Sequence, residues 1–139
     1  MDDDPSGFLR DLVAAVNAHD IEALVACFAE GYVNETPAHP ARGFVGVDQV
    51  RSNWSMIFGA VPDITATVDA QAVSGGTIWS EWALDGIRAD GNAHHMRGVM
   101  IFEVAGRQAT AVRFYLEPLD EGATAINAVV RQAVGGEPS

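Results

Sequence analysis

The sequence contains no lysine, one cysteine and no long apolar run. Its 8 basic residues, all arginines, stand against 19 acidic residues, which gives a formal net charge of −11 over 139 residues. Without a basic patch to neutralise a row of phosphates, nucleic acid and anionic membrane surfaces are poor partners. No stretch approaches the roughly 18 consecutive apolar residues of a membrane span. A single cysteine, Cys27, excludes an internal disulfide and a multi-cysteine zinc site, which fits a reducing cytoplasm.

Motifs for metals, nucleotides and secretion are also missing. The four histidines, His19, His39, His94 and His95, show none of the usual metal-ligand spacings, so no metal site is expected. No glycine-rich phosphate loop follows a predicted strand. Residues 1–6 open with three aspartates rather than the basic and apolar segments of a signal peptide. We therefore expect a cytoplasmic protein with no cofactor, beginning with a disordered acidic tail over residues 1–6.

Of all residues in the chain 48% are apolar, and in the first part of the chain their spacing is helical. Apolar residues recur with the 3.6-residue period of helices that bury one face. Ser6 and Asp20 are the expected N-caps of the first two helices, and Gly31 is expected to end the second. A C-terminal extension over residues 119–139 carries a further helical pattern. The predicted helices cover residues 8–16, 21–28, 48–58 and 123–134.

After Pro62 the apolar period changes to two, which predicts strands. Short turn signals at Gly75-Gly76, Asp90-Gly91-Asn92 and Ala105-Gly106 suit tight antiparallel connections. Helices followed by strands indicate a single α+β domain, with helices on one face of a curved antiparallel sheet. If the sheet curls around the helices, its inner face can line a cavity. The predicted strands cover residues 63–73, 76–87, 94–104 and 107–117.

Several short sequence segments resemble those of a known family. They are His19-Asp20-Ile21-Glu22-Ala23-Leu24-Val25, Phe28-Ala29-Glu30-Gly31, Arg97-Gly98-Val99-Met100-Ile101-Phe102 and the run from Gly106 to Pro118. With the order of elements, they resemble the SnoaL-like branch of the nuclear-transport-factor-2-like superfamily over residues 8–118. The resemblance implies a cone: a curved antiparallel sheet wrapped on three N-terminal helices, plus a C-terminal helix. That superfamily includes isomerases, cyclases, epoxide hydrolases, dehydratases and non-catalytic binders, so the fold alone does not select an activity.

Comparison with two enzyme types of the superfamily narrows the chemistry. At the proton-transfer positions of ketosteroid isomerase this chain has Leu12, Thr36 and Met100, which argues against a steroid-isomerase mechanism. The pair Tyr32 and Asn34 resembles the water-positioning pair of limonene epoxide hydrolase. Further resemblance to that enzyme places Asp85 at its aspartate, Ala83 at its arginine and Glu117 near its second carboxylate. SnoaL-like cyclases also use an acid on a late strand, for which Glu117 is again the candidate.

The resemblance implies which strand residues face the cavity. Two-residue turns at Gly91-Asn92 and Ala105-Gly106 would place Asp85 beside Gly98 and Gly98 beside Arg113. Arg113 could then reach across Gly98 to Asp85, since the outer two of three strands lie about 9.5 Å apart. The same register places His94 opposite Glu117 as a proton-transfer pair. The expected inward residues are Glu81, Ala83, Asp85, Gly98, Met100, Phe102, Ala111, Arg113, Tyr115 and Glu117.

The leading hypothesis is a cofactor-independent enzyme that cyclises, isomerises or opens the epoxide of an apolar small molecule by general acid–base catalysis. Each polar candidate also has a structural interpretation: an ion pair inside the sheet, a solvent-exposed histidine, a solvated acid or a turn-forming asparagine. The catalytic candidates are Asp85, Glu117, Arg113, His94, Tyr32 and Asn34. The expected pocket residues are Glu81, Ala83, Met100, Phe102, Ala111, Tyr115, Trp79 and Trp54.

Two other functions remain open: a non-catalytic small-ligand binder that uses the same cavity, and a dimerisation module. Val112, Phe114 and Leu116 are expected on the sheet face opposite the cavity. A sheet that is apolar on both sides must cover both sides, so a homodimer is expected under each hypothesis.

Overall fold

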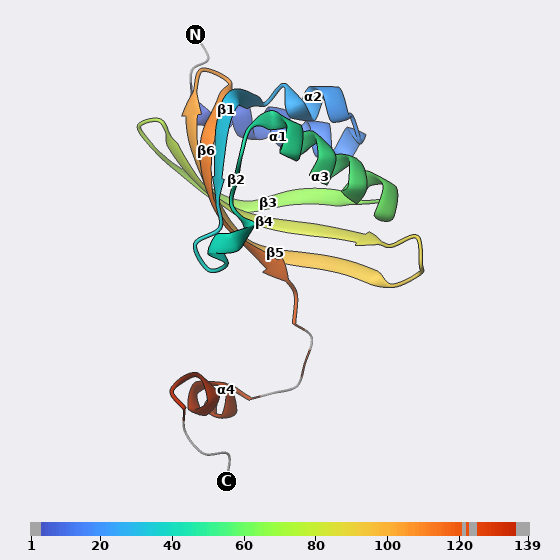
Figure 1. Ribbon diagram of the computed structural model, residues 1–139, viewed down its shortest axis with the longest axis vertical. Helices are drawn as coiled ribbons and strands as arrows, with labels where there is room; N and C mark the ends of the chain where they lie inside the picture. The colour runs from blue at the N-terminus through green and yellow to red at the C-terminus, as the bar shows by residue number, and fades with distance from the viewer. Residues whose placement is uncertain (1–3, 121, 123–124, 136–139) are drawn as a thin grey trace.

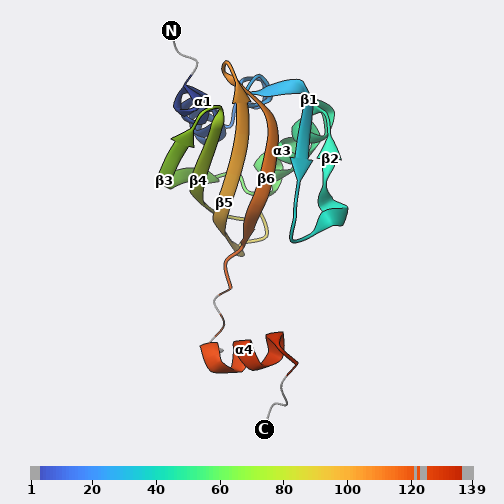
Figure 2. The ribbon, with the colours of Figure 1, turned by 90° about the vertical axis from the view of Figure 1, so that its left-hand side faces the viewer.

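Three helices lie against the concave side of one curved sheet in the computed structural model, which describes residues 4–120, 122 and 125–135 (Figure 1). The described helices are α1 (Pro5–Ala18), α2 (Ile21–Val25), α3 (Val47–Ala60) and α4 (Ile126–Ala133), with the short 3₁₀ helix η1 (Pro40–Arg42). The strands are β1 (Phe28–Glu35), β2 (Phe44–Val45), β3 (Thr65–Ser74), β4 (Thr77–Ile87), β5 (Ala93–Ala105) and β6 (Gln108–Pro118). In both ribbon views α4 lies apart from the sheet and the other helices (Figure 2).

The sheet has the strand order β2-β1-β6-β5-β4-β3. Strands β3 to β6 form the expected antiparallel meander, but β1 runs parallel to β6. The prediction of a purely antiparallel sheet is therefore wrong at this one pairing. A parallel pair needs a long connection, and here helix α3 and most of the meander separate the two strands in sequence. The result is an α+β fold with a mixed sheet.

The N-cap of the first helix lies two residues before the expected one. Asp4, not Ser6, is the N-cap: its Oδ1 accepts a hydrogen bond from the Ser6 backbone N–H at 2.9 Å. Pro5 follows in the first turn, where its missing N–H costs nothing. Residues 5 and 6, expected in a tail, thus belong to α1, and residues 1–3 lie outside the described part of the chain. At the other end His19 adopts a left-handed conformation with φ of 54°.

The second helix is shorter than predicted. Asp20 caps it as expected, with Oδ1 accepting from the Ala23 N–H at 3.0 Å, but α2 ends at Val25. Phe28 already pairs with Ala109 of β6, and Gly31 lies inside β1 rather than ending a helix. Pairing with the sheet therefore outweighs the helical spacing at Phe28. The start expected for the last helix, at residue 123, lies outside the described residues, and α4 covers Ile126–Ala133.

The four predicted meander strands are present, but their register is wrong. Asp85 lies opposite His95 instead of Gly98, because residues 88–92 connect β4 to β5 and not two residues. Gly98 lies opposite Leu116 instead of Arg113, because the turn lies at Gly106-Arg107 instead of Ala105-Gly106 and a β-bulge between Glu103 and Val104 shifts the pairing by one more residue. His94 pairs with Gly86, not with Glu117. A slip of an odd number of residues sends every side chain of a strand to the other face.

The core lies between α1 and the concave sheet face. Phe8 of α1 contacts the ring of Phe102 edge-on at 4.9 Å between centroids and that of Phe28 at 6.4 Å. Trp82 of β4 is 1% exposed in the same layer. The prediction that Val112, Phe114 and Leu116 face away from the helices is wrong, because Val112 and Leu116 are buried in this core and Phe114 packs against it.

Candidate ligand-binding pocket

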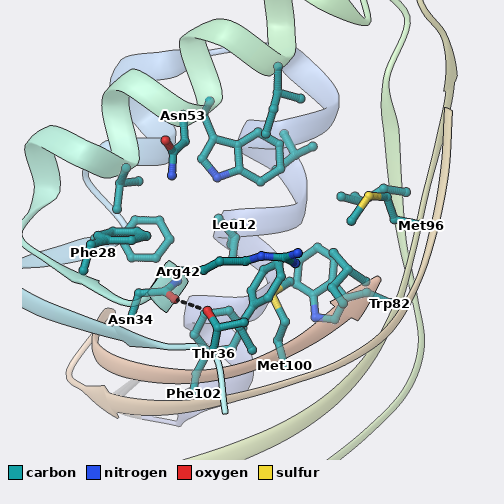
Figure 3. A pocket seen from close by; sticks show the side chains of 18 of the residues that line it. Leu12, Phe28, Asn34, Thr36, Arg42, Asn53, Trp82, Met96, Met100 and Phe102 are labelled. Carbon is teal, nitrogen blue, oxygen red and sulfur yellow. Dashed lines mark hydrogen bonds between the residues drawn. The ribbon is translucent and has the colours of Figure 1, made fainter. Parts of the chain in front are cut away.

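An apolar cavity of about 260 Å³ opens between the helices and the concave face of the sheet (Figure 3). Its walls come from α1, α3, η1, β1, β2 and the meander strands β4 to β6. Within the described part of the chain, no carboxylate lines it. The lining residues are Leu12, Val16, Phe28, Tyr32, Asn34, Thr36, Arg42, Phe44, Val50, Asn53, Trp54, Ile57, Trp82, Leu84, His94, Met96, Met100, Phe102, Phe114 and Leu116.

One wall carries a row of three polar side chains on alternate residues of β1 and its end. Asn34 Nδ2 donates to the Tyr32 hydroxyl oxygen at 3.3 Å, and Thr36 Oγ1 donates to Asn34 Oδ1 at 3.2 Å. Burial raises the pKa of Tyr32 well above its usual range, outweighing the hydrogen bond from Asn34. The phenol is thus protonated, and its O–H remains available to donate into the cavity.

The wall formed by β4 and β5 is held by one buried serine. Ser80 is 2% exposed, and its hydroxyl donates to the Met100 carbonyl oxygen at 2.6 Å. The Ser80 hydroxyl oxygen in turn accepts a hydrogen bond from the Trp82 indole N–H at 2.8 Å. The indole N–H of Trp82 and the hydroxyl of Ser80 are therefore both hydrogen-bonded within the wall and do not face the cavity. The indole of Trp82 presents its apolar surface to the ligand space, as Figure 3 shows.

Three charged or titratable side chains lie close together where the loop after β1 meets the end of β6. We call this place the mouth of the cavity. His39 Nε2 lies 2.7 Å from Glu117 Oε1, and Arg42 Nη1 lies 3.9 Å from Glu117 Oε2. The loop is closed by turn bonds from the His39 N–H to the Thr36 carbonyl at 2.8 Å and from the Arg42 N–H to the His39 carbonyl at 2.9 Å. Arg42 thereby becomes a lining residue of the cavity.

Six of the residues expected at the site do line this cavity. They lie on β1, α3 and β5: Tyr32, Asn34, Trp54, His94, Met100 and Phe102. Leu12 and Thr36, compared above with catalytic positions of ketosteroid isomerase, line it too. Arg42 and Asn53 were missed. An arginine in a loop between two prolines and a glycine was the available signal for Arg42; nothing in the spacing marked Asn53.

The other expected residues lie outside the cavity. In the observed register the odd-numbered residues of β4 face the convex side of the sheet. The odd-numbered residues of β6 that follow the bulge also face that side. The inward placement predicted for them is therefore wrong. Glu117 lies at the end of β6, bonded to His39 beside the mouth. The residues on the convex face are Trp79, Glu81, Ala83, Asp85, Ala111, Arg113 and Tyr115.

On the convex face Asp85 meets different partners from those expected. Its Oδ1 accepts from His95 Nδ1 at 2.6 Å and from Arg97 Nη1 at 2.8 Å. Partial burial raises the pKa of Asp85, but the hydrogen bonds from Arg97 and His95 outweigh it, so the pKa lies below the ordinary value. Arg113 instead lies over the ring of Trp79, with Cζ 5.9 Å from the centroid. The predicted Asp85–Arg113 pair does not form.

Two other candidate chemistries find no support among the described residues. Burial raises the pKa of the Cys27 thiol to about 11, with a further contribution from Asp11, which makes it a poor nucleophile. Within the described ranges, no group of three His, Cys, Asp or Glu side chains is arranged to hold a metal ion.

None of the described helices has the length and apolarity needed to cross a membrane.

The family assignment follows from the matched region. Residues 9–112, which include most of α1, α2, α3, the first five strands and the start of β6, match the SnoaL-like domain. The chain belongs to the SnoaL-like domain family. No curated protein sequence matches this SnoaL-like chain.

Solved structures share the fold of this SnoaL-like domain at low sequence identity. RV0760c from Mycobacterium tuberculosis, in complex with estradiol-17β-hemisuccinate, has a TM-score of 0.69 and 22% identity, covering 80% of this chain and 92% of that one. A protein from Catenulispora acidiphila with a ketosteroid-isomerase-like fold, in complex with trimethylamine, has a TM-score of 0.64 and 16% identity, covering 78% and 84%. An NTF2-like protein of unknown function from Exiguobacterium sp. 255-15 has values of 0.65 and 21%, covering 81% and 98%.

Proposed function

We propose that this protein binds an apolar small molecule bearing an oxygen function in the cavity between its helices and sheet. The observation that carries the proposal is the placement of the Tyr32, Asn34 and Thr36 row against an otherwise largely apolar lining. Binding pockets for small molecules combine such apolar walls with a few placed polar groups that fix orientation. Two structures of the same fold hold small molecules, the estradiol derivative and trimethylamine.

In this proposal the Tyr32 hydroxyl donates a hydrogen bond to the ligand oxygen. It accepts from Asn34, which is itself held by Thr36, so the three side chains present the O–H in a fixed direction. The raised pKa of Tyr32 keeps this donor protonated at neutral pH. The apolar body of the ligand then contacts Trp54, Trp82 and the other side chains of the lining.

Tryptophan fluorescence tests this proposal. Trp54 and Trp82 line the cavity, whereas Trp79 is 47% exposed on the convex face. We expect a panel of apolar phenols, ketones and carboxylates to include compounds that change the emission of a Trp79→Phe variant saturably. Leu116→Arg, which places a charge in the cavity wall, serves as the blocked variant, with folding checked by circular dichroism. A panel without a saturable response, or a response equal in the folded blocked variant, would contradict ligand binding here.

We propose acid–base catalysis as a second candidate function, with His94 in the role expected of a carboxylate. His94 lines the cavity and belongs to the residue type whose charge changes near neutral pH, whereas the described lining has no acid. In this hypothesis His94 moves a proton to or from a bound molecule during a cyclisation, isomerisation or epoxide opening, and Tyr32 holds the substrate oxygen. Loss of turnover in His94→Gln, with turnover kept in His95→Gln, would support it.

For the convex face we propose a second copy of this chain as the covering partner. Trp79 and Tyr115 are 47% and 39% exposed there, beside the buried side chain of Ile101. The same face carries both acids and arginines, among them Asp85 and Arg97, so two copies related by a two-fold axis can pair opposite charges. Sedimentation equilibrium should show a dimer that Trp79→Glu dissociates. A monomer over the micromolar range would contradict the proposal.

A further inference from the structure

We infer that the ligand of this cavity carries a carboxylate or similar anionic group, which Arg42 binds at the mouth. This inference rests on the proposed function and specifies the chemical class of its ligand. It comes from the contacts of Arg42, the position of Glu117 and the absence of acids from the described lining.

The first argument is the distribution of charge around the cavity. Arg42 is the one arginine among the described lining residues, and the described lining contains no carboxylate to neutralise it. Its guanidinium is therefore a cation facing the cavity, and Glu117, the acid paired with it at 3.9 Å, lies outside the lining. Because Arg42 is 61% exposed and solvent screens its charge, its attraction for an anion depends mainly on direct N–H···O bonds from the guanidinium. A ligand with an anionic end is favoured over a neutral one.

The second argument is that the hydrogen-bonding capacity of Arg42 is unused. Among the described residues its closest acid is Glu117, at 3.9 Å, which is an ion-pair distance but too long for a hydrogen bond. Glu117 places its other oxygen 2.7 Å from His39. The carboxylate of Glu117 is thus already partnered, and the five N–H donors of the Arg42 guanidinium have no hydrogen-bond acceptor among the described residues and can bind a ligand.

The third argument is the direction of the Arg42 side chain. Figure 3 shows it running across the cavity instead of turning away from it. Its backbone is fixed in η1 by the turn bonds of the loop, and His39, three residues earlier, ties the loop to Glu117. A guanidinium on a fixed loop can meet a carboxylate with two parallel N–H···O bonds. The apolar body would then extend from Arg42 toward Trp82 and Met100.

Glu117 acts in this arrangement as the internal counter-ion that a ligand replaces. Without ligand, its weak ion pair with Arg42 compensates the charge at the mouth. When an anionic ligand binds, Arg42 can turn to it while Glu117 keeps its bond with His39. The exchange costs little, because the ion pair that is given up is 3.9 Å long and Arg42 is 61% exposed.

A matched pair of probes separates this inference from the proposed function. We would measure the Kd of 2-naphthoate and of 2-naphthamide, which share shape but differ in charge, by calorimetry at neutral pH. The full-length chain would be tested as wild type, Arg42→Gln, Arg42→Lys and Arg10→Gln. Arg10 is exposed on α1 and does not line the cavity, so Arg10→Gln changes the net charge equally without touching the site.

The expected result is about tenfold tighter binding of the carboxylate than of the amide by wild type, the size of a charge-assisted hydrogen bond. Arg42→Gln should remove this preference and leave the amide unchanged, Arg42→Lys should restore part of it, and Arg10→Gln should keep it. Equal binding of both probes by wild type, or a preference that survives in Arg42→Gln, would overturn the inference while leaving the proposed function intact. If neither probe binds wild type, both fail.

Discussion

The two faces of the meander use the same strands and different chemistry. The concave face pairs apolar side chains with a few satisfied polar groups, such as Ser80, and encloses a cavity. The convex face carries the Asp85, His95 and Arg97 cluster and leaves Trp79 half exposed. Because Asp85 and Arg113, the ion pair expected in the cavity, lie on the convex face, charged side chains on adjacent strands are a poor guide to the site of this protein.

The largest difference between the faces should appear in core stability. Trp82→Ala removes a buried indole from the concave face and should lower the free energy of unfolding by about 3–5 kcal/mol. Trp79→Ala removes an exposed indole and its contact with Arg113, and should cost about 1 kcal/mol or less. Urea denaturation at low protein concentration measures both. Equal losses would mean that the two tryptophans are equally buried in solution.

The next effect concerns the buried serine. Ser80→Ala leaves the Trp82 indole N–H without its acceptor, and we expect a loss of about 1–3 kcal/mol. Ser55→Ala, on the exposed side of α3, is the matched control and should be neutral. Equilibrium denaturation by urea measures the difference. A neutral Ser80→Ala would show that the indole finds another partner.

Two neighbouring histidines on β5 allow the contributions of the two faces to ligand binding to be compared directly. His94 lines the cavity, whereas His95 contacts Asp85 on the other side. For any ligand found in the fluorescence panel, His94→Gln should weaken binding about three- to tenfold, the value of one hydrogen bond. His95→Gln should leave the Kd unchanged. The reverse order would place the ligand on the convex face.

The smallest expected effect is the pH dependence of Asp85. Its pKa is lower in the folded chain than in the unfolded one, so ionised Asp85 stabilises the fold above its unfolded pKa of about 4. The contribution disappears as the pH falls through the lower, folded pKa. Because solvent reaches the pair, we expect only about 0.5 kcal/mol. Asp85→Asn should reduce stability at pH 7 by that amount and converge with wild type in acid; a constant difference at every pH would contradict the assignment.

The sequence predicted the four meander strands well, because periodicity and turn residues are local signals. Their ends agree within two residues, and Asp20 caps α2 as expected, but Phe28 of β1 was assigned to a helix. The side of the sheet that each side chain faces was predicted less well. On β5 it was correct, and Met100 and Phe102 line the cavity. On β4 it failed because the connection to β5 holds five residues where two were expected, an odd difference that reverses every side chain.

On β6 the error has a separate cause. Ala109, before the bulge, is fully buried, as an inward odd-numbered residue should be. Thr110 is then the extra residue of the bulge, and beyond it the even-numbered residues Val112 and Leu116 are buried instead. A bulge leaves little trace in a two-residue pattern, since it is set by the fit of β6 between two neighbours. The sequence therefore predicted a cavity lined by Arg113, whereas the arginine that lines the cavity in the structure is Arg42.

Gly98 limits how such a cavity can be redesigned. It lies on β5 between Trp82 and Leu116, with φ of 154°, and an added Cβ would approach the Tyr115 carbonyl oxygen to 2.1 Å. Both the backbone conformation and the neighbouring strand thus forbid any side chain at this point of the wall. Variants selected for new ligands should consequently accumulate at Met100, Phe114 and Leu116, while position 98 stays glycine through every round.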